Sequence, residues 1–220
     1  MNVFEYLIRA DTSRKTRWHD SKSNFVGLAG LLYTPIALGS TGMRYLLGYR
    51  PVCPWFPQPA IKALERLIRR DWRILEFGSG MSTIWLASRC DFLHSIEHDA
   101  TWFANVSALL EQRGLTSHVR YELRDLTSYC NLSEYTNPGI FFDLCIVDGA
   151  QRAKCIAQAV SRIKPGGYVY WDNSDNVDDD AREAEKHLLE GIQERHGECQ
   201  YFLGFPPTTF HVTRGMLARL

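Results

Sequence analysis

A glycine turn between an apolar segment and a helical one carries the first candidate binding residues. It lies in residues 74–80, Ile-Leu-Glu-Phe-Gly-Ser-Gly. Glycines there let the backbone approach a ligand, and the following helix start presents free N–H groups. The dinucleotide pattern G-x-G-x-x-G needs glycine where Thr83 stands, and the Gly-Lys-Ser/Thr of a phosphate loop is absent. Glu76 would repel a phosphate, but its carboxylate suits a ligand that carries an ammonium group.

Polar side chains after the next apolar segments supply the second group of candidates. Glu97 closes residues 95–97, Ser-Ile-Glu, and stands 17 residues after Gly80. At the tip of a strand, its carboxylate can accept hydrogen bonds from two ribose hydroxyls, with a plain surface carboxylate as the alternative. His98 is placed to pack on an adenine face. Asp125 is predicted either to contact the adenine amino group or to cap a turn.

Two further predicted strands end in oxygen-bearing side chains. Asp148 follows the first of these strands, and Asp172 with Asn173 follows the second. Carboxylate and amide oxygens suit Mg²⁺ or Ca²⁺, and such a cation would lower the pKa of a substrate hydroxyl. The alternative is that the two aspartates contact a cofactor or substrate directly, or cap loops.

These candidates depend on strands and helices that alternate along the chain from residue 60. Strands are predicted at 72–77, 92–96, 119–123, 142–147 and 168–171, with a closing pair at 201–203 and 209–212. Helices are predicted at 60–70, 82–89, 102–113, 153–163 and 179–195, and a sharp turn at 164–167. The alternation indicates crossover units and a mostly parallel sheet that is covered on both faces.

Length, charge and cysteine content narrow the class of protein. The 220 residues fit one domain, residues 56–220, after an N-terminal extension, residues 1–55. Lys+Arg and Asp+Glu both number 25, so the net charge is zero and no global basic field favours nucleic acid. The six cysteines include no C-x-x-C pair, which favours reduced, packed thiols in a cytoplasmic protein.

The N-terminal extension contains an uncharged stretch, residues 23–43, preceded by Arg14, Lys15 and Arg17. A basic flank before an uncharged stretch is one feature of a membrane segment. Glycines, a proline and several hydroxyls interrupt this stretch, so a buried lid or docking segment is the preferred interpretation, and membrane association the alternative. Residues 1–12 do not read as a signal peptide, because Glu5 and Asp11 interrupt them.

Four motifs, taken in order, resemble those of class I S-adenosylmethionine-dependent methyltransferases. They are residues 75–80, 95–97, 143–149 and 164–167. The resemblance covers about residues 55–215 and implies an α/β, Rossmann-like, doubly wound fold. That fold has a mostly parallel seven-stranded sheet with an antiparallel C-terminal strand, here with an N-terminal helical extension. Residues 205–210 fit the last antiparallel strands.

The resemblance also implies a cofactor, S-adenosylmethionine (SAM), and assigns residues to it. The glycine turn would hold the methionine part, Glu97 the ribose, and His98 and Asp125 the adenine. Asp148 would lie near the sulfonium or the acceptor. The residues implied for SAM are Glu76, Gly78, Ser79, Gly80, Ser82, Thr83, Glu97, His98, Asp125 and Asp148.

Asp148, Asp172 and Asn173 match the metal ligands of the catechol O-methyltransferase-like subgroup, which implies Mg²⁺ or another divalent cation. That subgroup often carries a basic lysine three residues after its first ligand, but this chain has Gln151 there. The proton acceptor therefore stays open among Asp148, His98 and His211, with Asp148 preferred.

The expected activity is methyl transfer to a hydroxyl oxygen of a small-molecule acceptor. Open alternatives are an N-methyltransferase, a sugar or lipid methyltransferase at a membrane surface through residues 23–50, and a non-catalytic cofactor-binding domain. Trp55, Phe56, Trp102 and residues 25–50 either shape the acceptor pocket or are ordinary core aromatics. The sequence leaves open whether the chain is a homodimer.

Overall fold

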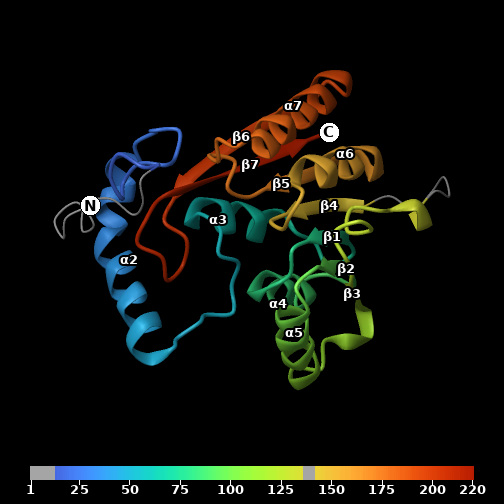
Figure 1. Ribbon diagram of the computed structural model, residues 1–220, viewed down its shortest axis with the longest axis horizontal. Coiled ribbons are helices and arrows are strands. Elements are labelled where there is room, and N and C mark those ends of the chain that lie inside the picture. Colours follow the sequence, from blue (N-terminus) through green and yellow to red (C-terminus); the bar gives the residue numbers. More distant parts are fainter. Residues whose placement is uncertain (1–12, 136–141) are drawn as a thin grey trace.

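The computed structural model describes residues 13–135 and 142–220 (Figure 1). Expectations that fall on residues 1–12, including the acidic residues Glu5 and Asp11, lie outside the described part. The helices are α2 Gly27–Leu47, α3 Gln58–Leu67, α4 Met81–Ala87, α5 Ala100–Gln112, α6 Arg152–Arg162 and α7 Asp179–Glu194. The strands are β1 Arg73–Phe77, β2 Phe92–Glu97, β3 Val119–Leu123, β4 Phe142–Val147, β5 Ile163–Trp171, β6 Glu198–Gly204 and β7 Thr213–Arg219.

The seven strands form one sheet in the order β3-β2-β1-β4-β5-β7-β6. The five strands from β3 to β5 are parallel to their neighbours, whereas β7 runs antiparallel between β5 and β6. From β1 the chain builds outward through β2 and β3, then returns to the other side of β1 with β4. The sequence-based prediction of a mostly parallel, doubly wound sheet with an antiparallel C-terminal strand is confirmed.

Helices cover both faces of this sheet, with α6 and α7 on one face and α3, α4 and α5 on the other (Figure 1). Consecutive residues of the central strands alternate between two cores. Leu75 and Phe77 pack with the α6 and α7 side, and Ile74 packs with the α3 and α4 side. Because both faces are buried, the central strands β1 and β4 are mostly apolar on both sides, and Glu76 in β1 is a buried polar exception.

Two local predictions differ from the structure. Residues 164–167 were expected as a sharp turn before a strand, but they lie inside β5. Phe142 pairs with Ile163 and Leu144 with Tyr168, so four residues of β5 bulge opposite a single residue of β4. Gly166 takes a φ of +78° there, and Lys164 forms an ion pair with Asp143 across the bulge.

The closing strand lies at Thr213–Arg219, so the prediction of a strand at 209–212 is wrong. The sequence of β7 contains two arginines and Gly215, so it does not show the apolar pattern of a strand. Gly215 is required by packing, because a Cβ at this position would lie 2.1 Å from the hydroxyl of Tyr170 on β5. Packing against β5 therefore requires glycine at this position, although glycine is unfavourable inside a strand.

The N-terminal extension contains the long helix α2, which includes Pro35. Ala37 is its only fully buried residue and packs with Phe205 and Val212. The expectation that this segment is buried is therefore wrong for most of α2. Within residues 13–135 and 142–220, no helix is long and apolar enough to cross a membrane.

Candidate functional site

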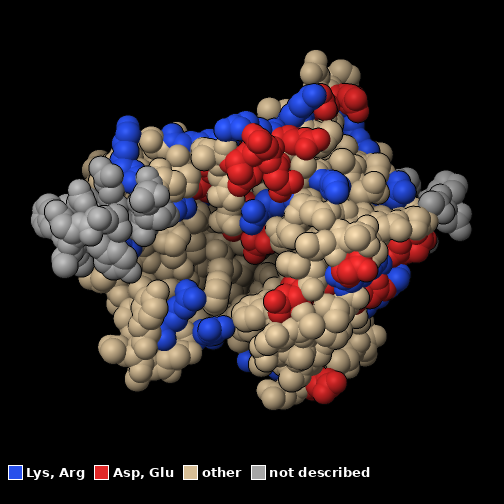
Figure 2. All heavy atoms as spheres, viewed as in Figure 1, with Lys and Arg blue, Asp and Glu red and all other residues tan. Residues whose placement is uncertain are grey.

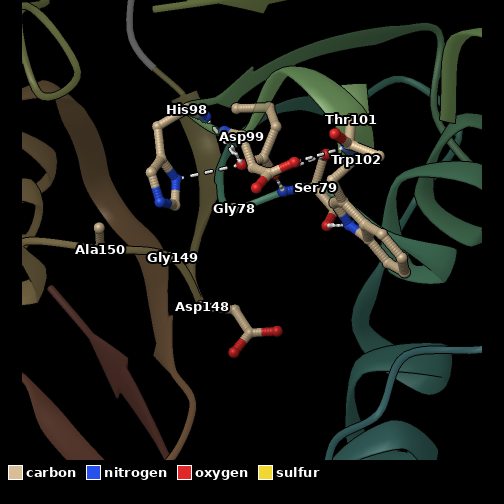
Figure 3. A pocket seen from close by; sticks show the side chains of 10 residues that line it. Gly78, Ser79, His98, Asp99, Thr101, Trp102, Asp148, Gly149 and Ala150 are labelled. Carbon is tan, nitrogen blue, oxygen red and sulfur yellow. Dashed lines mark hydrogen bonds and ion pairs between the residues drawn. The ribbon is translucent and has the colours of Figure 1, made fainter. Parts of the chain in front are cut away.

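A cavity of about 590 Å³ opens at the carboxyl ends of β1, β2 and β4 (Figure 3). The strand order reverses between β1 and β4, so their connections leave in opposite directions and a crevice remains between them. The lining residues are Gly78, Ser79, Glu97, His98, Asp99, Thr101, Trp102, Asp148, Gly149 and Ala150. The structure thus brings together much of the predicted set from three separate loops.

The loops after β1 and β4 touch each other at Gly78 and Gly149. Gly78 has a φ of +90°, and its N–H donates to the carbonyl of Ile96 at 2.9 Å. A Cβ at Gly78 would lie 2.5 Å from the backbone nitrogen of Gly149. A Cβ at Gly149 would lie 1.9 Å from the hydroxyl of Tyr129. Only glycine satisfies both the left-handed backbone and this close approach.

Glu76 lies behind the turn rather than in the cavity wall. Its carboxylate accepts hydrogen bonds from the hydroxyls of Thr83 and Ser95, both at 2.6 Å, and the Thr83 oxygen accepts from the Gly80 N–H at 2.9 Å. Burial raises the pKa of Glu76 to about 7. Glu76, Ser82 and Thr83 are buried and brace the turn from beneath, without lining the cavity.

One carboxylate oxygen of Glu76 keeps an unused hydrogen-bonding capacity. Oε1 is buried and forms no hydrogen bond of normal geometry with a described residue, although the Ser82 hydroxyl acts on this carboxylate and opposes the rise of its pKa. A buried acceptor without a donor is costly, so such atoms usually find a water or a ligand. This orphaned oxygen fits a cationic ligand group near the turn.

Glu97 closes β2 and lies in the cavity wall, as the sequence predicts. One of its oxygens accepts from the N–H and hydroxyl of Ser79 at 2.9 and 2.8 Å. The other accepts from the backbone N–H groups of His98 and Asp99 at 2.7 and 2.9 Å. These bonds hold a nearly buried carboxylate beside the glycine turn, where the Ser79 hydroxyl can rotate to release one acceptor position.

His98 and Asp125 differ in their relation to the cavity. The His98 ring lines it, with Nδ1 3.1 Å from Glu97 and the ring edge-on to Tyr129 at 5.4 Å (Figure 3). Asp125 is exposed and does not line it. Its Oδ1 accepts from the hydroxyls and N–H groups of Thr127 and Ser128, and these bonds lower its pKa to about 2. The structure thus shows the turn role of Asp125.

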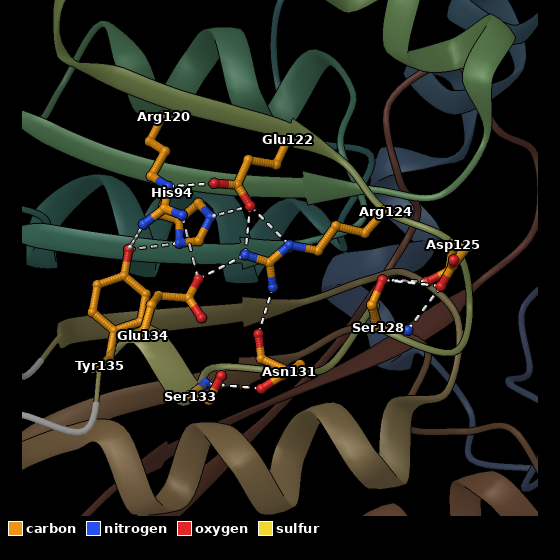
Figure 4. A network of polar contacts seen from close by, with 10 residues as sticks. All are labelled: His94, Arg120, Glu122, Arg124, Asp125, Ser128, Asn131, Ser133, Glu134 and Tyr135. Carbon is orange, nitrogen blue, oxygen red and sulfur yellow. Dashed lines mark hydrogen bonds and ion pairs between the residues drawn. The ribbon is translucent and has the colours of Figure 1, made fainter.

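To one side of Asp125, a polar network fastens the loop that follows β3 (Figure 4). His94, Glu122 and Glu134 place ligand atoms within 4.8 Å of one another. Arg124 pairs with both glutamates, and Arg120 pairs with them as well. Burial lowers the pKa of His94 to about 4. Because two guanidinium groups already neutralise the carboxylates, this group is a structural ion-pair network rather than a cation site.

Asp148 is the carboxylate that faces the cavity without a partner. Its side chain points into the space opposite His98 (Figure 3) and forms no hydrogen bond with any described residue. Burial raises the pKa of Asp148 to about 6, while the Arg152 guanidinium opposes that rise and Glu97 adds to it. This group is therefore ionised at neutral pH but ready to take a proton.

The three predicted metal ligands lie beside a fixed positive charge. Asp172 Oδ1 accepts from the Tyr170 hydroxyl at 2.9 Å, and Asn173 Oδ1 accepts from Arg152 at 3.2 Å. Burial and the nearby Asp148 raise the pKa of Asp172 well above its ordinary range, while Arg152 opposes that rise. A guanidinium that uses the asparagine oxygen and interacts with both aspartates does not fit beside a divalent cation.

Several cavity residues were not assigned to the cofactor from the sequence. Asp99 caps α5 by accepting from the Trp102 N–H at 2.7 Å, and this cap turns Thr101 and Trp102 toward the cavity. The Trp102 indole donates to the Ser79 carbonyl. An N-cap aspartate two residues after Glu97 was the available signal.

Other residues weighed from the sequence lie away from the cavity lining. Phe56 is buried in the core, with its ring 4.6 Å from that of Tyr170. His211 lies between β6 and β7 and does not line the cavity. Trp55 stacks under the Arg44 guanidinium at 4.6 Å, and Arg50 lies between the rings of Trp55 and Trp102. In Figure 2 a hollow opens in this face, with basic side chains on its α2 side and acidic ones opposite.

No protein-family model matches the chain, and no curated protein matches it. Solved structures do. An O-methyltransferase from Streptomyces achromogenes, TomG, solved with SAM, has a TM-score of 0.62 at 20% identity over 93% of this chain and 97% of its own. An O-methyltransferase from Bacillus cereus, solved with S-adenosylhomocysteine, has a TM-score of 0.61 at 15% identity, covering 86% and 90%.

The same fold also occurs in a protein with a different kind of acceptor. An rRNA methylase from Streptococcus thermophilus has a TM-score of 0.57 at 15% identity, covering 78% of this chain and 98% of its own. Likeness at these identities establishes architecture, because one fold supports many substrates. The chain has the fold of the class I SAM-dependent methyltransferases.

Proposed function

We propose that this protein binds SAM in the cavity at the β1–β4 switch point and transfers its methyl group to a hydroxyl of a small molecule. The observation that carries the proposal is the pairing of two carboxylates across one cavity. Glu97 is held in the wall by four protein donors, and Asp148 faces the space with a raised pKa. The TomG structure, which contains SAM, supports the choice of cofactor.

The residues present fit SAM in charge as well as position. The orphaned Oε1 of Glu76 and the Asp148 carboxylate suit a ligand with an ammonium and a sulfonium group. Glu97 would hold the ribose, and the His98 ring would flank the adenine. Asp125 does not line the cavity, so we propose a smaller contribution to adenine binding from Asp125 than from His98.

Bound SAM supplies a methyl group activated by the positive sulfur, and the chain supplies alignment and a base. Asp148 accepts the hydroxyl proton as the acceptor oxygen forms its bond to the methyl carbon and the carbon–sulfur bond breaks. A carboxyl with a pKa of about 6 is mostly ionised at neutral pH, and its partial burial strengthens it as a base.

We infer that Arg152, rather than a divalent cation, balances the charge of Asp148 and Asp172. Its contact with Asn173 and its electrostatic effect on both aspartates support this inference. No step of the proposed reaction runs through a metal. Transfer activity is expected to be unchanged by a chelator; a loss that Mg²⁺ restores would contradict this inference.

Calorimetry with S-adenosylhomocysteine tests the cofactor site. The wild type is expected to bind, and Glu97→Ala is expected to weaken binding at least about tenfold, because the ribose loses a charged acceptor and the Ser79, His98 and Asp99 N–H groups lose theirs. Glu111→Ala, which removes an exposed glutamate at the end of α5, is the matched control and should bind like the wild type. Absence of wild-type binding at sub-millimolar ligand would refute the proposal.

A screen with methyl-labelled SAM tests the acceptor. Small hydroxylated compounds are offered to the wild type and to Asp148→Asn, and labelled products are separated by mass. Products methylated on oxygen, and lost in the variant, are expected. Products methylated only on nitrogen would replace the hydroxyl assignment with the amine alternative.

A further inference from the structure

Helix α2 has its polarity inverted relative to an ordinary surface helix. Leu28, Leu32 and Leu46 expose 80%, 82% and 84% of their surfaces, and Ile36 exposes 57%. These positions recur at helical spacing on one side, which is here called the outer face of α2, together with Met43 and Leu47.

The opposite side of α2 carries its polar groups and packs on the protein. Thr34 accepts a hydrogen bond from the Trp18 indole at 3.0 Å, and Arg44 stacks on Trp55. Ala37, between them in sequence, is buried against Phe205. A surface helix normally turns its apolar residues inward, whereas the outer face of α2 is a row of exposed apolar side chains, the kind of surface that marks an interaction site.

The chemistry of the outer face favours lipid over protein as its covering. Its leucine, isoleucine and methionine side chains offer no hydrogen-bond donor or acceptor. Protein interfaces carry about one hydrogen bond per 100–200 Å², whereas acyl chains require none. Aromatic residues lie near both ends of the helix, with Phe25 before it, Tyr45 in its last turn and Tyr49 after it, all exposed. Tyrosine is enriched at the membrane–water interface, where its ring lies at the level of the headgroups.

Charge points to the same partner. Between Asp20 and Glu65 the sequence contains no acidic residue, and its four charged residues, Lys22, Arg44, Arg50 and Lys62, are all basic. Figure 2 shows basic side chains beside the C-terminal end of α2. Lys22 is paired with Glu185 of α7, so the basic charge beside the helix lies at its C-terminal end, with Arg44 and Arg50. An apolar face with basic residues at one end matches the boundary layer of an anionic leaflet.

We propose that the outer face of α2 lies in the headgroup–acyl boundary of an anionic membrane. The helix rests in the plane of the bilayer, its leucines among the upper acyl carbons and the rest of the chain in water. Arg50, which follows α2, lies over the rings of Trp55 and of Trp102 in the cavity wall, so the C-terminal end of the helix is connected to the cavity. The proposal does not depend on the reaction proposed above.

Vesicle flotation tests this. Wild-type protein is mixed with vesicles of phosphatidylcholine alone, or with added phosphatidylglycerol. Flotation with the anionic vesicles is expected, and at least about tenfold less with the variant Leu28→Gln/Leu32→Gln/Leu46→Gln. The control Leu123→Gln/Leu189→Gln removes half-exposed leucines of β3 and α7 and should float like the wild type. Because all these leucines are exposed, the variants should fold, and S-adenosylhomocysteine binding and thermal melting check this.

Three outcomes would overturn the proposal. The wild type fails to float with anionic vesicles, or the triple variant floats as well as the wild type. In the third outcome, the wild type does not float, and light scattering shows that the wild type is a dimer and the triple variant a monomer. The last result would assign the outer face to a second copy of the chain.

Discussion

At the scale of single residues, the site separates carboxylates by environment. Glu97 is saturated with protein donors, Asp125 is exposed and hydrogen-bonded, and Asp148 is desolvated with no donor among the described residues. The ordinary pKa values of Asp125 and Asp148 are the same, so surroundings alone lower the pKa of Asp125 to about 2 and raise that of Asp148 to about 6. Burial also raises the pKa of Glu76 to about 7 and the pKa of Asp172 well above its ordinary range.

The first residue-scale prediction concerns the pH dependence of transfer. The base is active when Asp148 is ionised, so kcat/KM is expected to rise with pH and level off above about 6. Asp148→Asn should lower kcat by about 10²–10⁴-fold and abolish this dependence. Initial rates across the pH range measure both effects, with S-adenosylhomocysteine affinity as the check on folding. A variant that keeps the wild-type profile would remove Asp148 from the proposed role.

The second concerns stability and Glu76. Its pKa rises from 4.5 unfolded to about 7 folded, so folding favours the neutral acid. This contribution is fully present below pH 4.5 and is lost as pH rises to about 7, a change of about 3 kcal/mol. In Glu76→Gln the amide oxygen still accepts the hydrogen bond from the Thr83 hydroxyl, but the side chain no longer titrates. The variant should match the wild type near pH 5 and exceed its stability at pH 8.

Denaturant unfolding at several pH values measures the Glu76 effect. Glu65→Gln, a substitution of an exposed acid on α3, is the control and should follow the wild-type curve. Equal stability of Glu76→Gln and the wild type at every pH would show that the carboxyl is not the titrating group.

At the scale of elements, the cavity exists because two strand-to-helix connections meet. The β1 connection has to turn at Gly78 within contact distance of the β4 connection. The N-cap of α5 and the brace from Thr83 to Glu76 then fix the walls on either side. The helix α4 has only seven residues, so these side-chain contacts, rather than helix propensity, hold its start in place.

The element-scale prediction is that Gly78→Ala damages both the fold and the site. The added Cβ meets Gly149 backbone at 2.5 Å, and the φ of +90° is strained for alanine. A destabilisation of about 1–3 kcal/mol and loss of S-adenosylhomocysteine binding are expected. Gly39→Ala in α2, where a Cβ meets nothing within 4 Å, is the control and should stabilise by about 0.5–1 kcal/mol. Similar behaviour of the two variants would contradict this account of the turn.

At the scale of the whole molecule, the N-terminal segment and the sheet domain are joined by a buried carboxylate. Asp175, after β5, accepts from the backbone N–H groups of Ser21 and Arg214, both at 3.0 Å. Arg14 adds a contact at 3.4 Å. This one side chain therefore ties residues of the predicted extension to the closing strand β7, although the extension begins the chain and β7 ends it.

Asp175→Ala is expected to free the N-terminal segment and lower the free energy of unfolding by about 3 kcal/mol, because buried donors lose their acceptor. Trypsin should then cleave faster at Arg14, Lys15 and Arg17. Denaturation and limited proteolysis measure the two effects, and Asp71→Ala, an exposed aspartate, is the control. Unchanged proteolysis would mean that other contacts hold the segment.

Strand and helix positions through the parallel part of the sheet were determined by the sequence itself. The predicted strands at 119–123 and 142–147 coincide with β3 and β4, and the order of motifs implied the doubly wound sheet. These features arise from local periodicity and turn chemistry, which are written within about ten neighbouring residues. The strand-end positions of Glu97 and Asp148 follow from them.

Only the tertiary structure decided what depends on residues distant in sequence. Gly215 lies in β7 because the Tyr170 hydroxyl occupies the space of a side chain, and residues 164–167 form a bulge within β5. Arg152 lies among the predicted metal ligands. The tertiary structure also turned the leucines of α2 outward, because the polar side of that helix found partners on the protein. Packing between residues at least 16 positions apart in the chain made these choices, and no local pattern contains that information.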